Sequence, residues 1–357
     1  MKFGMLHLFE NPLGRTEKEI VDEQLDIMVR SEEYGFDSVW PAEHHFSEYG
    51  YCASPALSLA AVAARTKKIR LGTGVVVLPL NHPVRVAEDY AIIDLMSDGR
   101  VDLGLGRGYQ PHEFQGYGVD QTRSRDMFRE GVEIIQKAWT EERFSYDGEF
   151  YQAHDLSVRP KPLQKPHPPI WMASLSPETF ELCGRYGFNL MCAPVFGFDV
   201  NRGAVQIEQY RQALRDHGRD SANFEVAALV MTYVADTSQE ALDDFAEPVM
   251  WYYHTFTKYI APPPGQEAVP TYEMYTRARD FLASATWDAV VQGGAVIAGS
   301  PDQVVDRIGR ITEACGITHY LCWTRIGGLA HPKVMRSMEL MASKVMPQLR
   351  ATASATP

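Results

Sequence analysis

The sequence has little positive charge for its length. Its 357 residues include 34 Lys or Arg and 46 Asp or Glu, which gives a formal net charge of −12. Proteins that bind nucleic acid or an anionic membrane surface normally carry a basic patch that neutralises phosphates. We therefore expect neither nucleic acid nor a membrane surface among the partners of this chain.

Cysteine and long apolar runs are also scarce. The five cysteines are scattered and form no Cys-x-x-Cys pair, which argues against a zinc ribbon or a disulfide framework and is typical of reduced thiols. No stretch reaches the ~18 apolar residues that would span a bilayer. The N-terminal segment reaches charge and proline too early for a secretory signal. These absences predict a cytoplasmic protein.

Two common nucleotide-binding loops are missing. The sequence contains no Gly-x-x-x-x-Gly-Lys-Ser/Thr loop. The glycines at Gly104, Gly106 and Gly108 lack the Gly-x-Gly-x-x-Gly spacing of a Rossmann dinucleotide site. The chain therefore shows no motif with which it would bind a nicotinamide dinucleotide itself.

The pattern that is present alternates short apolar strands with amphipathic helices. One such helix, over residues 16–34, opens with a capping box formed by Thr16 and Glu19. Short connections between alternating strands and helices predict a parallel sheet with helices outside it. The expected strands are residues 2–9, 37–41, 69–78, 101–105, 170–173, 189–193, 224–235 and 319–323. Eight strands favour one closed (β/α)₈ TIM barrel over an open doubly wound sheet.

Two insertions interrupt this alternation. Residues 144–151 are expected to form a hairpin with Asp147 and Gly148 at its turn, inside an insertion over residues 143–169. The Pro-rich stretch 261–270 and the aromatic-bearing helix after it form a longer excursion, 255–290, which predicts a mobile lid. We expect a single barrel domain over residues 1–347 and a C-terminal tail over 348–357.

Candidate catalytic residues follow the second strand. In a (β/α)₈ barrel the active site lies at the C-terminal ends of the strands, where this sequence places Glu43, His44 and His45. A carboxylate beside a histidine can hold the neutral imidazole in one tautomer for acid–base catalysis. A metal site, which needs three or four ligands, and a pair of structural histidines are the alternatives. The strand-end position favours catalysis, and we expect no metal.

Candidate phosphate-binding residues follow the fourth and fifth strands. Arg107 is a permanent cation between two glycines, and arginine pairs bidentately with phosphate. Ser174 and Ser176 precede a helix that opens at Pro177, whose N–H groups form a second phosphate-binding element. Arg125 begins the helix after the fourth strand and completes the group. Surface ion pairs and an N-cap role for Ser176 explain each residue separately, but together they indicate a phosphate-bearing cofactor.

The glycines of the third strand permit a close approach to a flat ring. In the run from Gly72 to Val75, glycine removes the side chain that would obstruct such an approach. A bulge in the strand is the alternative explanation.

The combination of these residues resembles the bacterial luciferase-like flavin monooxygenases, in particular the luciferase α subunit. The resemblance is dense over residues 1–139 and returns at 174–179 and 299–301. The matching positions are 43–46, 48, 65–67, 77–79, 82–85, 88–89, 95–100, 107–108, 114, 118–120 and 124–125. It implies a barrel that binds reduced FMN (FMNH₂), which reacts with O₂ to give a C4a-peroxyflavin.

The resemblance also implies roles for individual residues. His44 matches the catalytic histidine, and Glu43 matches a neighbouring acid that shapes the flavin site. Arg107 matches the phosphate-binding arginine, with Arg125, Ser174 and Ser176 nearby. Gly74 and Val75 match a pair behind the isoalloxazine ring that is joined by a cis peptide bond.

One position departs from the luciferase pattern. Luciferases carry a reactive cysteine immediately before the Arg-Gly pair, where this chain has Gly106. The missing side chain is expected to leave more room near the flavin edge. The departure argues against light emission and against a long-chain aldehyde substrate.

The resemblance therefore implies a two-component monooxygenase. A separate NAD(P)H:flavin reductase supplies FMNH₂, because this chain shows no second nucleotide-binding motif. The product is a small or mid-sized organic molecule oxygenated by hydroxylation or Baeyer–Villiger insertion, and the family pattern suggests a homodimer. The alternatives are an F420-dependent oxidoreductase, a non-catalytic flavin-binding protein and a metal-dependent barrel hydrolase.

Overall fold

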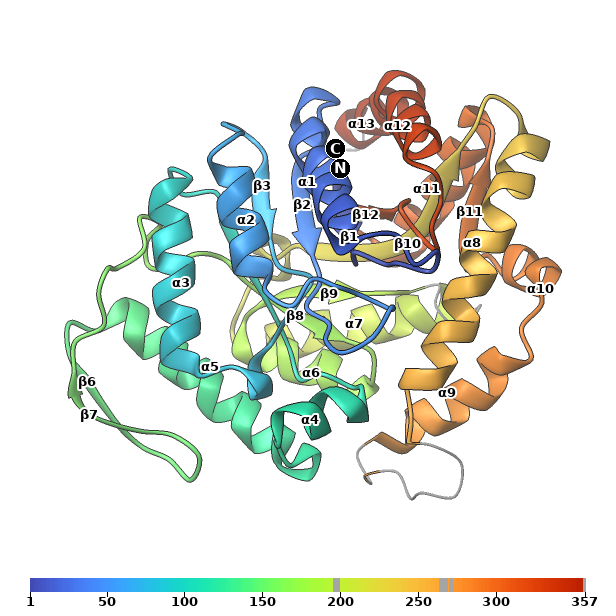
Figure 1. Ribbon diagram of the computed structural model, residues 1–357. Coiled ribbons are helices and arrows are strands. Elements are labelled where there is room, and N and C mark those ends of the chain that lie inside the picture. The colour runs from blue at the N-terminus through green and yellow to red at the C-terminus, as the bar shows by residue number, and fades with distance from the viewer. Residues whose placement is uncertain (195–199, 263–268, 270–271, 356–357) are drawn as a thin grey trace.

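A closed barrel of parallel strands forms the centre of the computed structural model (Figure 1). The structure describes residues 1–194, 200–262, 269 and 272–355. Each barrel strand pairs in parallel with the next, and the last pairs with the first. The strands are β1 (Lys2–His7), β2 (Ser38–Pro41), β3 (Arg70–Gly72), β5 (Val101–Gly106), β8 (Ile170–Ser174), β9 (Asn189–Cys192), β10 (Val226–Val234) and β12 (His319–Trp323). The predicted (β/α)₈ barrel is confirmed.

The third predicted strand, residues 69–78, is broken in the structure. After β3 the chain leaves the ladder and rejoins it at β4 (Val76–Val77), which pairs with β5. The Thr73 hydroxyl donates to the Gly104 carbonyl at 2.7 Å and accepts from the Gly104 N–H at 2.8 Å. A side chain thus satisfies the backbone groups that continuous strand pairing would use.

A further short strand, β11 (Val296–Gly299), was not predicted. It pairs with the C-terminal half of β10, from Met231 to Val234, outside the closed ring. It lies a few residues after the end of the excursion, where the regular strand–helix alternation was interrupted, so no alternation marked it.

Helices surround the barrel, and the first of them begins at the predicted N-cap, Thr16. Thr16 and Glu19 form the expected capping box, and proline occupies the first turn of several others. The helices are α1 (Glu17–Glu33), α2 (Pro55–Ala63), α3 (Pro83–Met96), α5 (Ser124–Thr140), α6 (Pro177–Tyr186), α7 (Val200–Asp216), α8 (Ser238–Tyr259), α9 (Glu273–Ala283), α11 (Pro301–Cys315) and α12 (His331–Leu340). Short helices at α4 (Pro111–Tyr117) and α10 (Trp287–Gln292) were missed.

The C-terminal residues continue the fold. A π-helical turn (Met341–Val345) joins α12 to α13 (Met346–Ala355), so most of the predicted tail over 348–357 is helical. The Arg350 guanidinium donates to an Asp37 carboxylate oxygen at 2.8 Å. Asp37 precedes β2, so this contact fixes α13 against the barrel.

A hairpin is present where it was predicted, but it extends beyond residues 144–151. Its strands β6 (Phe144–Asp147) and β7 (Gln152–Leu156) pair antiparallel, and the turn between them spans residues 148–151. The hairpin projects from one side of the barrel (Figure 1). The Glu130 carboxylate of α5 accepts hydrogen bonds from the backbone N–H groups of Glu149, Phe150 and Tyr151. This contact ties the turn of the hairpin to the helix beneath it.

The predicted lid, residues 255–290, includes 263–268, 270 and 271, which lie outside the described residues. Its described parts are the end of α8, the whole of α9 and the beginning of α10. Figure 1 shows α9 beside the lower end of α8, on the side of the barrel that also holds α4.

Aromatic rings fill the barrel interior near the N-terminal ends of its strands. Trp40, Trp171 and His319 contact one another edge to face, with ring centroids 5.3 to 5.9 Å apart. A Cβ atom at Gly72 would lie 2.2 Å from the Trp40 ring, so the packing requires glycine there. All three rings are buried, so they form part of the barrel core.

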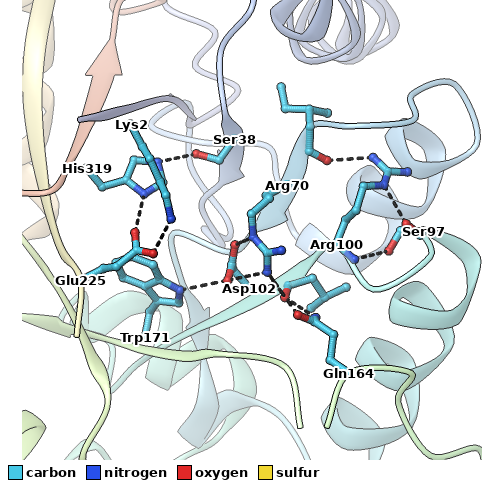
Figure 2. A network of polar contacts seen from close by, with 12 residues as sticks. Lys2, Ser38, Arg70, Ser97, Arg100, Asp102, Gln164, Trp171, Glu225 and His319 are labelled. Carbon is cyan, nitrogen blue, oxygen red and sulfur yellow. Dashed lines mark hydrogen bonds and ion pairs between the residues drawn. The ribbon is translucent and has the colours of Figure 1, made fainter. Parts of the chain in front are cut away.

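A polar network lies at the same end (Figure 2). The Glu225 carboxylate contacts Lys2 and lies 3.6 Å from His319, whose Nε2 lies 2.7 Å from the Ser38 hydroxyl. Beside it, the Arg70 guanidinium donates two hydrogen bonds, of 2.5 and 2.9 Å, to the buried Asp102 carboxylate. Trp171 donates to the same carboxylate at 3.3 Å. These side chains close the N-terminal end of the barrel.

All five cysteines are free and buried. Among the helices that the structure describes, none is long and apolar enough to cross a bilayer.

Candidate active site

A cavity opens at the C-terminal ends of the barrel strands. It is lined from several loops, and it contains seven of the eight residues that the sequence singled out. Those residues are Glu43, His44, Gly74, Val75, Arg107, Ser174 and Ser176. The eighth, Arg125, lines a neighbouring cavity. Sequence positions far apart therefore converge here because parallel strands end at one rim.

His44 is paired with a carboxylate that the sequence analysis missed. Its Nδ1 lies 2.9 Å from Glu113 Oε1, and the same oxygen accepts the His45 backbone N–H at 2.9 Å. Burial alone would raise the pKa of Glu113, but the charge of His44, its hydrogen bond and the His45 N–H outweigh burial and lower it. An ionised Glu113 keeps the proton on Nδ1, which leaves Nε2 of His44 as the nitrogen that can exchange a proton.

Glu113 was missed because the sequence analysis predicted no helix at α4. The signal was present, since Pro111 occupies the first helical position and Glu113 follows two residues later. Glutamate in the first turn of a helix is common. Only the structure shows that this turn passes beneath the loop after β2.

Glu43 does not orient His44, which corrects the expectation drawn from their adjacency. Its carboxylate lies 3.0 Å from His45 Nε2, and it accepts from the Val77 N–H at 2.9 Å and the Asn81 amide at 2.8 Å. Consecutive residues of an extended loop point in different directions, so neighbours in sequence need not meet. Glu43 fixes the β2 loop against β4.

His45 is a structural histidine by its contacts. Besides Glu43, its Nδ1 lies 3.2 Å from the Tyr117 hydroxyl, and the ring is almost entirely buried. Both ring nitrogens therefore have partners within the protein. Of the two adjacent histidines, only His44 faces the cavity.

The cis peptide bond expected between Gly74 and Val75 is present. The Gly74 N–H donates to the Pro41 carbonyl at 3.0 Å, and the Val75 carbonyl accepts from Glu43 at 3.1 Å. A Cβ atom at Gly106 would lie 2.5 Å from Val75 Cγ2. The expectation that Gly106 leaves extra room is therefore wrong, because the Val75 side chain fills that space.

Arg107 lies where two cavities meet. With Ala173 and Thr179 it lines both the cavity that contains His44 and a second one rich in arginine. The charged residues that line the second cavity are the arginines Arg107, Arg125, Arg129 and Arg185 and the acids Asp126, Glu133 and Glu178. The first cavity is mostly apolar, whereas the second has one more arginine than acids, so Arg107 lies between an apolar lining and a weakly cationic one.

Tyr272 covers Arg107. The guanidinium carbon lies 4.5 Å from the centre of the Tyr272 ring, a cation–π distance. The Tyr272 hydroxyl donates to the Gly108 carbonyl at 3.0 Å and lies 2.9 Å from the Ser124 hydroxyl. This residue immediately precedes α9, so the predicted lid segment contacts the arginine directly.

The remaining predicted phosphate ligands are partly engaged elsewhere. Arg125 pairs with Glu178 at 2.7 Å and its side chain is 46% exposed, so it is not hidden in the cavity as expected. The Ser174 hydroxyl donates to the Thr179 carbonyl, and Ser176 forms a capping box with Thr179. The N-cap role of Ser176 is therefore real, and it places the N-terminus of α6 between the two cavities.

An aromatic wall completes the first cavity, and the sequence analysis assigned none of its members. It comprises Tyr49, Tyr109, Tyr252, Phe256, Tyr275 and Trp323, and it is called the aromatic wall below. Aromatic residues are too numerous in this chain for composition to distinguish wall from core. Among the described residues, no cluster of three His, Cys, Asp or Glu side chains is placed to hold a metal ion.

Comparison with known proteins gives a consistent picture. Residues 1–319 match the model of the luciferase-like monooxygenases. The alkanal monooxygenase alpha chain of Photorhabdus laumondii is 28% identical, with 98% of each chain covered. The oxygenase component of the flavin-dependent trigonelline monooxygenase of Acinetobacter baylyi is 27% identical over 97% of this chain and 95% of that protein.

A solved structure agrees with this assignment. The monooxygenase RslO1 of Streptomyces bottropensis superposes with a TM-score of 0.83 and 28% identity, covering 98% of this chain and 99% of that one. The expected resemblance is confirmed by the match over most of the sequence. The chain belongs to the luciferase-like monooxygenase family.

Proposed function

We propose that this protein is the oxygenase component of a two-component monooxygenase that uses reduced FMN and O₂ to oxygenate a small or mid-sized organic molecule. The observation that carries the proposal is the pair of cavities that meet at Arg107. FMN has a flat, largely apolar ring system at one end and a phosphate dianion at the other. The apolar cavity suits the ring and the arginine-rich cavity suits the phosphate, so the residues present fit this cofactor.

At the phosphate end, Arg107 and the N-terminus of α6 would hold the dianion. Helix N-termini and arginine both favour phosphate oxygens. Arg125 would join them after exchanging its exposed partner Glu178 for the phosphate, which costs little because exposed ion pairs are weak. Ser174 and Ser176 would define the edge of this subsite.

At the ring end, the Gly74–Val75 backbone would support one face of the flavin. Reduced FMN supplies the electrons that activate O₂. His44 would move the proton at Nε2, and Glu113 would stabilise the charged imidazole from Nδ1. Tyr272 and Tyr275 would exclude water from the cavity. We propose that this exclusion of water is the role of the lid segment, residues 255–290.

The proposal includes two protein partners. A separate NAD(P)H:flavin reductase would deliver reduced FMN, since the sequence shows no motif for a nicotinamide dinucleotide. A second copy of the chain would pack on an apolar face of α2 and α3, where Leu57 is 75% exposed and Ile92, Leu95 and Met96 are also exposed. The five buried free thiols suit a cytoplasmic location.

Anaerobic titration of the purified protein with FMN, reduced FMN and F420 tests the cofactor. We expect reduced FMN to bind at least tenfold more tightly than F420. With FMN and a candidate organic substrate present, oxygenated product should then form only when a flavin reductase, NADH and O₂ are all supplied. Tighter binding of F420, with hydride transfer in the absence of O₂, would establish the F420-dependent alternative. Flavin binding without turnover on any substrate would favour a non-catalytic flavin-binding protein.

A further inference from the structure

Three tyrosine hydroxyls form a hydrogen-bonded chain along the cavity. The rings of two of these tyrosines, Tyr49 and Tyr109, contact the His44 ring edge to face at 4.7 and 6.0 Å, but no hydroxyl of the chain bonds His44 in the described contacts. The Tyr49 hydroxyl lies 3.1 Å from that of Tyr109 and 2.9 Å from that of Tyr252. At the far end, the Gln110 side-chain amide donates to the Tyr109 hydroxyl at 3.2 Å. All three tyrosines line the cavity, so the chain runs from the strand β5 loop to helix α8.

The three tyrosine hydroxyls carry one hydrogen more than the hydrogen bonds among them use. Three hydroxyls carry three hydrogens, and they make two bonds among themselves. Burial raises the pKa of Tyr49, Tyr109 and Tyr252 well above the ordinary tyrosine value, so none of these hydrogens is lost near neutral pH. One O–H therefore remains for an acceptor outside the group.

The donor at Gln110 sets the direction of the chain. A hydroxyl that accepts a hydrogen bond becomes a better donor, so bonds in a chain polarise one another in one sense. Because Gln110 donates to Tyr109, the favoured arrangement has the Tyr109 hydroxyl donating to Tyr49 and the Tyr49 hydroxyl donating to Tyr252. The surplus hydrogen then belongs to Tyr252, which is one of the residues that line the cavity.

Aromatic faces surround Tyr252. Its ring contacts Trp323 edge to face at 4.4 Å and stacks on Phe256 at 5.5 Å. Elsewhere in the cavity lining, the ring of Tyr275 stacks on that of Tyr109, with centroids 5.5 Å apart. The charged residues of the cavity lining are Glu43, Arg107 and Glu113, none of which belongs to the aromatic wall. The wall is therefore suited to a neutral ligand with flat faces.

We propose that Tyr252 determines specificity, by donating a hydrogen bond to the phenol or carbonyl oxygen of a flat, neutral aromatic substrate. Phe256, Trp323 and Tyr275 hold the rings of that substrate, and Tyr49 is a positioning residue that acts through Tyr252. This inference rests on the proposed function, since it names the substrate class of the same cavity. An unbranched aliphatic aldehyde offers no ring face to this wall.

Calorimetric titration with 2-naphthol, naphthalene and decanal tests the inference. We expect 2-naphthol to bind the unaltered protein about tenfold more tightly than naphthalene, because one neutral hydrogen bond contributes about that much. Tyr252→Phe removes the hydroxyl and keeps the ring, so it should abolish this preference and leave naphthalene binding unchanged. Tyr49→Phe should reduce the preference by about threefold.

Tyr253→Phe is the matched control. Tyr253 is the buried neighbour of Tyr252 on α8 and does not line the cavity, so its substitution should leave the preference intact. Equal 2-naphthol affinity in the unaltered protein and Tyr252→Phe would overturn the inference. So would tighter binding of decanal than of 2-naphthol, or no measurable 2-naphthol binding.

FMN affinity measured on the same proteins separates this inference from the proposed function. Unchanged FMN binding in Tyr252→Phe, together with a lost preference for 2-naphthol, is the expected combination. Failure of the unaltered protein to bind FMN would contradict the proposed function, whereas the 2-naphthol preference would still decide the role of Tyr252.

Discussion

Both ends of the barrel bury a histidine beside a carboxylate. At the N-terminal end, His319 lies between Ser38 and Glu225 (Figure 2), and its ring packs against that of Trp40. At the C-terminal end, His44 is held by Glu113 on one side and borders a cavity on the other. The same pair of residue types thus serves stability at one end and leaves a ring nitrogen for chemistry at the other. The surroundings of the pair, and not its two residue types, decide whether it stabilises the fold or can take part in chemistry.

Replacing the histidine that borders the cavity should have the largest effect on turnover. His44→Ala removes the proton carrier, and loss of a positioned acid–base group typically lowers kcat by about 10²- to 10⁴-fold. FMN affinity and the free energy of unfolding should change little. Steady-state kinetics, FMN titration and urea unfolding measure the three quantities.

His154→Ala is the control for His44, since His154 is exposed on the hairpin strand β7. It should leave all three quantities unchanged. Equal losses of FMN affinity and turnover in His44→Ala would reduce His44 to a structural residue and remove the contrast between the two ends.

Breaking the network at the other end should cost stability and spare chemistry. Asp102→Ala leaves the half-buried Arg70 guanidinium and the Trp171 N–H without their acceptor. Removal of one partner of such a pair lowers the free energy of unfolding by about 3 kcal/mol. Urea unfolding is the measurement, and Asp22→Ala, at an exposed ion pair, should change the value by well under 1 kcal/mol. A loss of turnover in Asp102→Ala without loss of stability would contradict the assignment.

Acid should weaken the N-terminal network selectively. Burial would raise the pKa of Glu225, but the nearby His319 and the hydrogen bond and charge of Lys2 outweigh it and lower the pKa to about 2. Because this value is below that of the unfolded chain, the stabilisation is present above pH ~4.5 and is lost as the pH falls toward 2. Unfolding free energies measured from pH 6 to 2.5 should therefore fall less steeply in Glu225→Gln. Identical slopes would exclude Glu225 as a source of the acid sensitivity.

The smallest effect is expected at the exposed edge of the phosphate subsite. Arg125→Ala should weaken FMN binding by about two- to fivefold, because the side chain is half exposed and already paired with Glu178. Fluorescence titration with FMN measures the change. Glu178→Gln should strengthen FMN binding slightly, since it releases Arg125 from its ion pair. Weaker FMN binding in that variant would show that Arg125 is not part of the phosphate subsite.

The barrel could be predicted because its signals are local. Each strand is a short apolar run and each helix has a capping signal, as at Thr16 and Glu19. The broken third strand could not be predicted, because the Thr73 hydroxyl replaces backbone pairing with Gly104, 31 residues away. Strand β11 was not predicted, because four apolar residues after a long excursion show no periodicity.

The site was predicted where a strand end marked it and missed where a second segment completed it. His44 and Arg107 follow strands directly, so their convergence was expected. Glu113 and Tyr252 belong to helices whose approach to the cavity depends on tertiary packing. Adjacency in sequence also gave a wrong prediction, namely that Glu43 orients the His44 ring. In the structure Glu43 contacts His45 and strand β4 instead.

The central claim, that the joined cavities bind FMN with its phosphate at Arg107, is tested most directly by comparing FMN with riboflavin. Riboflavin has the same ring system and lacks the phosphate. Equilibrium titration of the unaltered protein and of Arg107→Ala, with the exposed Arg310→Ala as control, gives the ratio of the two affinities. The account predicts that Arg107→Ala weakens FMN at least tenfold and leaves riboflavin within twofold. Equal weakening of both ligands, or of neither, would contradict it.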